Sequence, residues 1–387
     1  VISGGTLQIG SGGGTGAPGA GAIVNNSSLV VNRSGSLTIA NDISGSGSLT
    51  KQGSGTLILS GANSFDGATT VSTGVLNVQS NTALGSTTGQ TTVASGARVE
   101  LQGGVTVTGE SVAINGTGGN NFGSLQSANG DNVWAGPVIL NGGSDTRVGA
   151  SEGTLTISGV IQDGATNRIR IRNNNGTTIF SGANTYTGRT DVLVGTLKLD
   201  GGDDRLPAGT ELHVGVNGTG GLAGTLDLNG WNQTVSGLVC DGLVSSSVTN
   251  NGAAPSTFTV NNASGFTYSG KLTSGTGTLN VVKSGAGDLA LSGNNSGLTG
   301  SVTVSDGRIL FASENSGSAQ AAWDLGTSEC LFNTDVGGTG KTVQLGSLTG
   351  VGGSILRNGG NGSGTTTFQV GALGASTTFA GAIRDFD

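Results

Sequence analysis

The chain has 387 residues, of which 77 are glycine and 4 are proline, and its formal net charge is -7. The few prolines exclude a collagen helix, and the small net charge with 34% hydrophobic residues disfavours a disordered chain. The acidic balance makes nucleic acid and anionic membranes poor partners, because both attract basic surfaces. No apolar run approaches the roughly 18 residues that predict a transmembrane helix.

In chain order, three segments carry nearly the same phrase, and each is followed by a short second phrase. The first phrases are residues 53–71, 175–192 and 285–302, and the second phrases are residues 74–78, 195–199 and 307–311, with an extra copy at 5–9. Such internal recurrence is typical of repeat architectures, in which one unit stacks on the next.

Within each copy, apolar residues alternate with a period of two, which predicts strands with one buried face. The segment from Leu57 to Leu76 reads as strand, turn, strand, turn, strand, with glycine, asparagine and serine at the turns. The pattern predicts an all-β fold, a parallel β-solenoid of about 17 coils with about 22 residues per coil. A β-sandwich or barrel would explain the alternation, but not the recurrence of whole phrases.

The phrase from Lys51 to Val78 resembles the autotransporter-associated β-strand repeat, and residues 171–199 and 283–311 resemble it more loosely. The third copy departs from the pattern, with Asn294 in place of alanine and Gly297 in place of the aromatic residue. The resemblance implies a right-handed parallel β-helix in the passenger region of a bacterial surface protein.

The organisation predicted from these repeats is one continuous solenoid over residues 1–387, with repeat cores at about 43–78, 155–199 and 266–311. Neither end reads as a polar capping coil, so we expect both ends to be excised from a longer chain. Only two cysteines, Cys240 and Cys330, are present. They are about four coils apart, too far for a disulfide, and we predict that both are free.

The predicted function is a non-enzymatic extracellular stalk or fibre at the bacterial cell surface, which presents loops for weak multivalent contacts. The expected partners are surface glycans or neighbouring copies, without nucleic acid, membrane insertion, metal or cofactor. One alternative is a subunit of a filament that assembles end to end. A polysaccharide-cleaving β-helix enzyme is less favoured, because no strand is rich in the paired carboxylates that sugar cleavage needs.

The best local binding candidate is a row of three arginines, Arg168, Arg170 and Arg172. They alternate with Ile169 and Ile171, so the three guanidinium groups share one strand face. This face could bind an anionic glycan or an acidic neighbour. The alternative is a solvated face whose aliphatic stems cover the coil.

Other candidate groups are better explained as structural. His213 is the only histidine and is expected to be a solvated surface residue beside Glu211. Asp203 and Asp204 predict a polar corner rather than a calcium site, because the tandem calcium-binding repeat is absent. The three tryptophans could stack on sugars, but corner or core packing is the favoured role. They are Trp134, Trp231 and Trp323.

Overall fold

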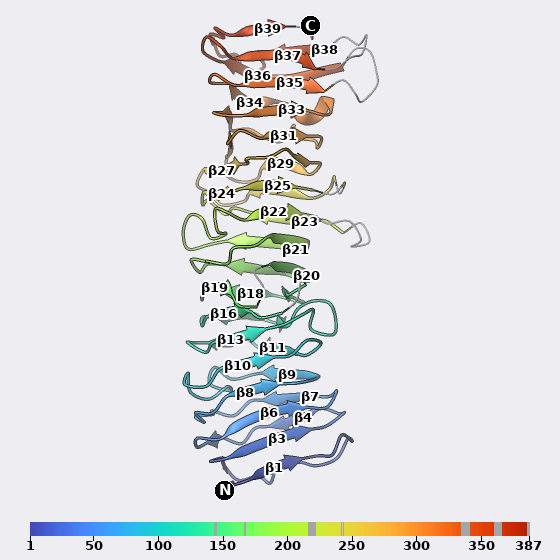
Figure 1. Ribbon diagram of the computed structural model, residues 1–387, viewed down its shortest axis with the longest axis vertical. Helices are drawn as coiled ribbons and strands as arrows, with labels where there is room; N and C mark the ends of the chain where they lie inside the picture. Colours follow the sequence, from blue (N-terminus) through green and yellow to red (C-terminus); the bar gives the residue numbers. More distant parts are fainter. Residues whose placement is uncertain are drawn as a thin grey trace. The chain divides into compact units, whose positions relative to one another are not determined.

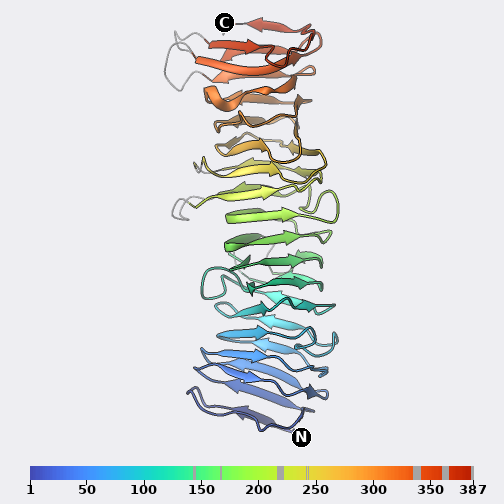
Figure 2. The same ribbon diagram turned by 180° about the vertical axis from the view of Figure 1, so that it is seen from behind.

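The structure, a computed structural model, describes residues 1–142, 145–165, 168–215, 222–240, 242, 244–333, 341–359 and 366–384. The chain divides into two compact units, unit 1 (Val1–Arg189) and unit 2 (Thr190–Asp387). Each unit is described by itself. Figures 1 and 2 show, for each unit, strands stacked as successive coils. The prediction of one continuous solenoid over the whole chain stays a prediction.

Unit 1 consists of short strands joined by glycine-rich turns. The strands are β1 (Thr6–Ile9), β2 (Ile23–Val24), β3 (Ser28–Asn32), β4 (Leu37–Ile39), β5 (Ile43–Ser44), β6 (Ser48–Gln52), β7 (Thr56–Leu59), β8 (Thr69–Val71), β9 (Val75–Val78), β10 (Thr91–Val93), β11 (Arg98–Gln102), β12 (Thr106–Val107), β13 (Val112–Ile114), β14 (Leu125–Asn129), β15 (Asp131–Trp134), β16 (Val138–Leu140), β17 (Arg147–Ala150), β18 (Thr154–Ile157), β19 (Ile161–Asp163) and β20 (Ile169–Phe180).

One sheet of unit 1 has the order β1-β3-β6-β8-β10-β13-β16-β19, so each coil contributes one strand to it. A second sheet contains β4, β7, β9, β11, β14, β17 and β20, and the series β12, β15, β18 joins it through β20. The described pairs are parallel, as in Leu37 with Leu57 and Leu57 with Leu76, and the register shifts within the pair of β11 and β14. Parallel pairing of strands one coil apart defines a β-solenoid.

Unit 2 follows the same plan. Its strands are β21 (Thr190–Leu199), β22 (Glu211–Val214), β23 (Gly224–Asp227), β24 (Gln233–Val235), β25 (Gly237–Val239), β26 (Ser247–Asn250), β27 (Ser256–Asn261), β28 (Phe266–Tyr268), β29 (Lys271–Ser274), β30 (Leu279–Ser284), β31 (Asp288–Leu291), β32 (Ser301–Val304), β33 (Arg308–Phe311), β34 (Ser318–Asp324), β35 (Glu329–Asn333), β36 (Lys341–Thr349), β37 (Ile355–Gly359), β38 (Thr366–Val370) and β39 (Ala382–Arg384). Among the described residues the only helical element is one 3-10 turn, η1 (Glu314–Ser316).

The sheets of unit 2 run in the orders β24-β27-β30-β32-β34-β36-β38 and β28-β31-β33-β35-β37-β39. A further sheet holds β21, β23, β26 and β29, and β22 and β25 extend from β21. The strands of each pair are again parallel. The predicted all-β solenoid is confirmed.

Over the described residues of the two units the structure has about 15 coils, against the predicted 17. Coils within a repeat are short, since Leu57 pairs with Leu76. Coils outside the repeats carry longer corners, since Leu197 pairs with Leu226. The expected 22 residues per coil came from the repeats alone and underestimated these longer coils.

The interior of each coil is filled by the alternating apolar residues of the repeats. Leu57, Leu59, Leu76 and Val78 are fully buried in the first repeat. In the third repeat the same inward positions are held by a matching set: Leu289, Leu291, Val302, Val304, Ile309 and Phe311. Because no coil can bury this face alone, stacking supplies the hydrophobic stabilisation.

Buried polar side chains join successive coils at the corners. Asn63 accepts a hydrogen bond from the Ile43 amide at 2.8 Å and donates to the Ala83 carbonyl at 2.6 Å, so it connects three coils. Asn295 makes the equivalent bonds in the third repeat, to the Leu272 amide and the Ser316 carbonyl. Each asparagine thereby satisfies a buried donor and a buried acceptor that the turn leaves out of the ladder.

A glycine lies two residues before Asn63, before Asn295 and before Asn184 of the second repeat, and close stacking of the coils requires it. A Cβ atom at Gly61 would lie 2.3 Å from the Asn41 carbonyl oxygen of the coil before it. At Gly182 and Gly293 the equivalent distances are 2.2 and 1.8 Å. All are shorter than any real contact, so only glycine allows the corners to stack.

The third repeat differs from the prediction at its corner. Phe65 and Tyr186 are fully buried in the first and second repeats, and Leu298, not Gly297, takes this inward place in the third. One additional residue between Asn295 and Leu298 is accommodated by a turn, in which the Leu298 amide donates to the Asn295 carbonyl at 2.9 Å. The motif alignment was therefore one residue out of register at this point.

Candidate functional site

The predicted arginine row lies on the outward face of β20. Ile169 and Ile171 are fully buried, and Arg168, Arg170 and Arg172 alternate with them and are partly exposed. The alternation is therefore as expected. Whether the row binds a ligand stays a prediction, and the neighbouring contacts show how it is arranged.

Asp145 holds two arginines of neighbouring coils together. Its carboxylate accepts two hydrogen bonds from Arg147, at 2.7 and 2.5 Å, and lies 2.9 Å from the Arg170 Nη1 atom. Burial alone would raise the pKa of Asp145, but the hydrogen bonds from Arg147 and Arg170 outweigh it and lower the pKa. The charge of Arg170 is thus partly balanced by a carboxylate, shared with Arg147, that was not predicted from the sequence.

Arg172 lies over the ring of Phe122, with its Cζ atom 5.6 Å from the ring centroid. Its Nε atom is buried and has no hydrogen-bond partner among the described residues. Phe122 belongs to a loop, residues 115–123, that connects β13 to β14. Arg172 therefore contacts a loop of its own chain rather than open solvent alone.

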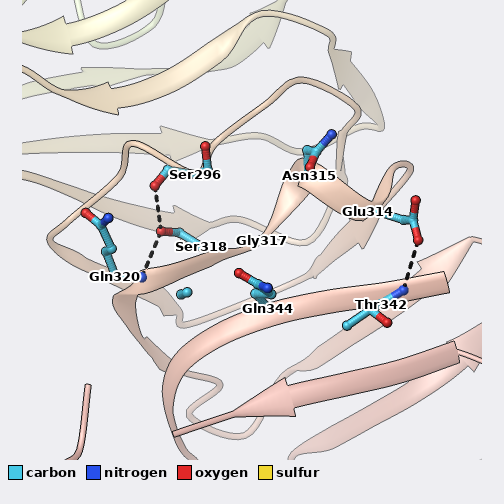
Figure 3. A pocket seen from close by; sticks show the side chains of 9 residues that line it. Ser296, Glu314, Asn315, Gly317, Ser318, Gln320, Thr342 and Gln344 are labelled. Atoms are coloured by element: carbon cyan, nitrogen blue, oxygen red, sulfur yellow. Dashed lines mark hydrogen bonds between the residues drawn. The ribbon is translucent and has the colours of Figure 1, made fainter. Parts of the chain in front are cut away.

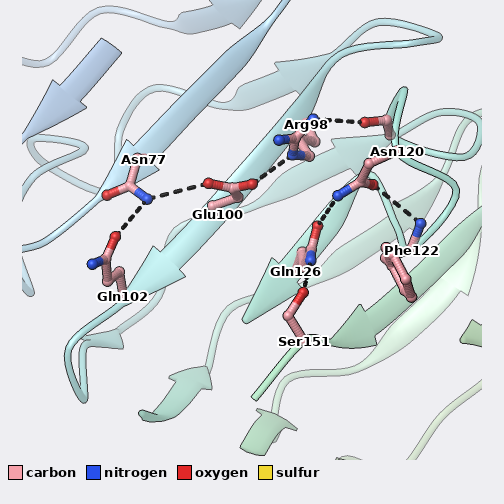
Figure 4. A network of polar contacts seen from close by, with 9 residues as sticks. Asn77, Arg98, Glu100, Gln102, Asn120, Phe122, Gln126 and Ser151 are labelled. Carbon is pink, nitrogen blue, oxygen red and sulfur yellow. Dashed lines mark hydrogen bonds and ion pairs between the residues drawn. The ribbon is translucent and has the colours of Figure 1, made fainter. Parts of the chain in front are cut away.

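Two further arginines fix the same loop. Arg98 donates to the Gly118 carbonyl at 3.2 Å, and Arg147 donates to the Asn121 carbonyl at 3.1 Å. Asn120 donates to Gln126 of the strand that follows the loop, at 3.0 Å. Figure 4 shows how this loop is tied to the outward sheet face. Arg98, Arg147 and Arg172 thus hold the 115–123 loop against this face.

Next to the loop, the outward face carries a ladder of uncharged and acidic side chains. Asn77 donates to Glu100 at 3.2 Å and to Gln102 at 3.0 Å, and Glu100 accepts from Arg98 at 2.6 Å (Figure 4). Gln79 extends the ladder to Asn77 at 2.9 Å. These residues come from consecutive coils, because β9 pairs with β11 in register. On each strand, polar residues occur at every second position. This spacing is the feature of the sequence from which the polar face could have been predicted.

Buried lysines occupy equivalent turns of the first and third repeats. Lys51 Nζ donates to the carbonyls of Gln52, Gly53 and Thr73, at 2.8, 2.7 and 3.1 Å. Burial lowers the pKa of Lys51 to about 8. Because Thr73 belongs to the next coil, the lysine joins two coils and is not free to bind a ligand.

Lys283 repeats this arrangement with the carbonyls of Ser284, Gly285 and Asp306, at 2.9, 2.7 and 3.2 Å. In the second repeat, the corresponding stretch belongs to the continuous strand β20 and contains the fully buried Asn173. Its Oδ1 atom accepts hydrogen bonds from the Ala150 amide and the Thr178 hydroxyl at 2.8 and 2.7 Å. A neutral amide that accepts hydrogen bonds is therefore buried there, in place of an ammonium group that donates them.

His213 is not the solvated surface residue that was expected. Its flanking residues Leu212 and Val214 are inside the coil, and its ring contacts the Glu211 carboxylate, as predicted. However, only 7% of His213 is exposed. The strands on either side place Asp191 and Val239 in register with it, and this covers the ring.

Asp203 and Asp204 form a polar corner, as expected. Asp203 accepts from the Asn232 amide at 2.8 Å, and Asp204 accepts from the Thr234 amide at 2.7 Å. Both carboxylates thus bind the backbone of the next coil. Across the described part of the chain, no group of three or more potential metal ligands occurs.

The cysteine prediction is confirmed, because Cys240 and Cys330 are both buried and form no disulfide with each other. Trp134 and Trp323 are buried as well, with 0% and 2% exposure, so neither can stack on a sugar. Trp231 lies at a corner, where its indole nitrogen donates to Asp200 at 3.4 Å.

Two acidic residues of unit 2, Asp288 and Glu329, pair with arginines. Arg308 lies 2.7 Å from Asp288 and 3.8 Å from Glu329. Glu329 also pairs with Arg357. These four residues belong to successive coils and form a charge ladder, in which hydrogen bonding to Asp288 raises the pKa of Arg308.

Comparison with known proteins gives three matches to one family, the passenger-associated-transport-repeat, at residues 49–78, 172–199 and 281–310. The chain therefore carries three passenger repeats, and the resemblance predicted from the sequence is confirmed. The matched segments lie within the three predicted repeat cores.

A stretch of 123 residues is 36% identical to the adhesin BmaC autotransporter of Brucella suis biovar 1 (strain 1330). This match covers 30% of the chain and 3% of that relative. No solved structure matches. Within the ranges that the structure describes, no helix is long and apolar enough to cross a membrane.

Proposed function

We propose that this chain is a segment of the extracellular passenger of a bacterial surface adhesin, and that it acts as a stiff, non-enzymatic stalk. Three passenger repeats and a relative named as an autotransporter adhesin support this location and role. In this proposal the solenoid holds its binding loops away from the cell surface and offers several weak contacts along its length.

The observation that carries the stalk role is the joining of each coil to the next by buried polar side chains. In the first repeat, Lys51 and Asn63 bond directly to the coils beside them. In the third repeat, Lys283 and Asn295 do the same. Added to the backbone ladders, these bonds resist bending and local opening of the stack.

The non-enzymatic part of the proposal is supported by the state of the carboxylates. Sugar cleavage needs one carboxylic acid and one carboxylate facing each other across a substrate. Here Asp288 and Glu329 are both bound by Arg308, and Glu100 is bound by Arg98. An arginine bound to each of these three carboxylates holds oxygens that a sugar-cleaving pair would have to present to its substrate.

Surface glycans are the proposed partners. The test uses the 387-residue chain on beads, with retention on glycan-bearing cells measured before and after periodate oxidation of the glycans. Retention that periodate abolishes supports the adhesive role. Release of reducing sugar, or beads that never bind, would contradict it, and concentration-dependent filaments in electron micrographs would replace it by self-assembly.

A further inference from the structure

The corner of the third repeat has one residue more than the corners of the first two repeats. Ser296 and Gly297 are both exposed there, and Leu298 takes the buried place that Phe65 and Tyr186 hold in the first two repeats. Two pockets of about 220 and 370 Å³ lie beside this corner. Both are lined by Asn315, so the two pockets adjoin at this residue, and together they are called the groove below.

The groove is lined mainly by uncharged polar side chains. Ser296, Asn315, Gln320 and Gln344 line the first pocket (Figure 3). Asn294 lines the second pocket, beside exposed Val244. Amides and hydroxyls arranged in this way suit a ligand rich in hydroxyl groups, and an exposed aliphatic side chain suits the apolar face of a sugar ring.

The two charged residues in the lining do not favour an ionic ligand. The Glu314 carboxylate accepts from the Thr342 amide at 3.1 Å and lies 3.7 Å from Lys341 Nζ, so its charge is already balanced (Figure 3). Lys271, in the second pocket, is the one remaining charge of the lining. One cation among many neutral groups gives little selectivity for an anionic chain.

Four of the lining residues, Lys271, Asn294, Asn315 and Gln344, come from four successive coils, and Val244 lies on the coil before them. Leu272, next to Lys271, bonds to Asn295, and the Asn295 amide bonds to the Asn315 carbonyl of the following coil. The next coil contributes Gln344. Coils repeat every ~4.8 Å, which is close to the length of one hexose unit in an extended polysaccharide.

From this match we infer that the groove binds a neutral polysaccharide laid along the stack, with one sugar unit per coil over four coils. The inference rests on the proposed adhesive function and names its ligand class and site. It is separate from the arginine row on β20, which would favour anionic glycans.

The test is isothermal titration and ligand-observed NMR on the full 387-residue chain. The probes are cellohexaose, laminarihexaose and mannohexaose, with hexagalacturonate as the anionic counterpart. We expect at least one neutral hexasaccharide to bind, and its affinity to fall at least tenfold in the double variant Asn315→Ala with Gln344→Ala. Both side chains are exposed, so the fold should persist. Asn174→Ala, an exposed asparagine in unit 1, is the matched control and should bind normally.

Chain length gives a second readout. A tetrasaccharide of the bound type should bind at least tenfold more tightly than the disaccharide, because it reaches all four coils. The inference is overturned if no neutral hexasaccharide binds, if the double variant binds like the control, or if only hexagalacturonate binds. If the double variant still holds cells in the bead assay, the groove inference fails while the adhesive function stands.

Discussion

The repeat coils and the coils between them are joined in different ways. In the first repeat, Lys51 and Asn63 are buried and bond to neighbouring coils. In the coils that follow, which are longer, the outward face carries the 115–123 loop and its pins Arg98 and Arg147. The repeats thus carry the buried side chains that bond one coil to the next, and the longer coils carry the loops on the outward face.

This difference indicates which positions of the solenoid can accept a substitution or an insertion without loss of the stacked fold. A corner glycine or a buried lysine touches two or three coils, so an altered residue there disturbs the whole stack. A pinned loop touches the sheet face from outside and can vary in length at small cost in loop entropy. The groove at the third repeat arises where a repeat corner itself has gained a residue.

The largest loss of stability is expected for Gly61→Ala in the first repeat. The new Cβ would lie 2.3 Å from the Asn41 carbonyl oxygen, so the coils must separate. We expect a loss of about 4 kcal/mol or more in the free energy of unfolding, measured by urea denaturation. Gly209→Ala, in a spacer corner with no atom within 4 Å, should change it by less than about 0.5 kcal/mol. Equal losses in both variants would contradict the stacking argument.

Lys51→Met tests the buried ammonium. Methionine fills a similar volume but leaves the carbonyls of Gln52, Gly53 and Thr73 without their donor. We expect a loss of about 2 to 3 kcal/mol, measured by the same denaturation. The control is Lys271→Met, because Lys271 is exposed and should give a change near zero. An unchanged Lys51→Met protein would show that the lysine does not hold the coils together.

A smaller effect on stability is expected at Glu110, which lies in a coil between the first and second repeats. It is 4% exposed, and its carboxylate accepts from Thr91 at 2.7 Å. Burial raises the pKa of Glu110 from 4.5 to about 7. Between these pH values the folded chain keeps a proton that the unfolded chain releases, so stability should fall as pH rises from about 4.5 to 7.

We expect this fall to be about 1 to 2 kcal/mol, after allowance for solvent screening at the corner. Urea denaturation at pH 4.5, 6 and 8 measures it. Glu110→Gln stays neutral and should remove this part of the pH dependence. The same slope in wild type and variant would assign the pH dependence to other groups.

Much of the fold could be predicted from the repeated phrases. The inward residues Leu57, Leu76 and Leu289 are buried as expected, because their two-residue period depends only on strand geometry. The coil number was too high, since spacer length follows no repeat. The register at Gly297 and Leu298 was wrong, because the motif alone does not show where a corner gains a residue.

The candidate site was less accessible from sequence. The shared face of Arg168, Arg170 and Arg172 follows from alternation. Their partners Asp145 and Phe122 lie 25 and 50 residues before Arg170 and Arg172, and only stacking brings them close. The burial of His213 has the same origin, since Asp191 and Val239 come from neighbouring coils.

By itself, the sequence determined the class of this protein, since strand alternation, glycine corners and passenger repeats are local properties of the chain. Only the tertiary structure decided which polar side chains are buried and bond to a neighbouring coil, and which lie on the surface. Lys51 and Lys271 are the same residue type, yet one is buried against carbonyls of the next coil and the other is exposed. The physical reason is that a hydrogen bond or close contact between coils depends on residues about 20 to 30 positions apart, whose register is set by the lengths of the turns between them.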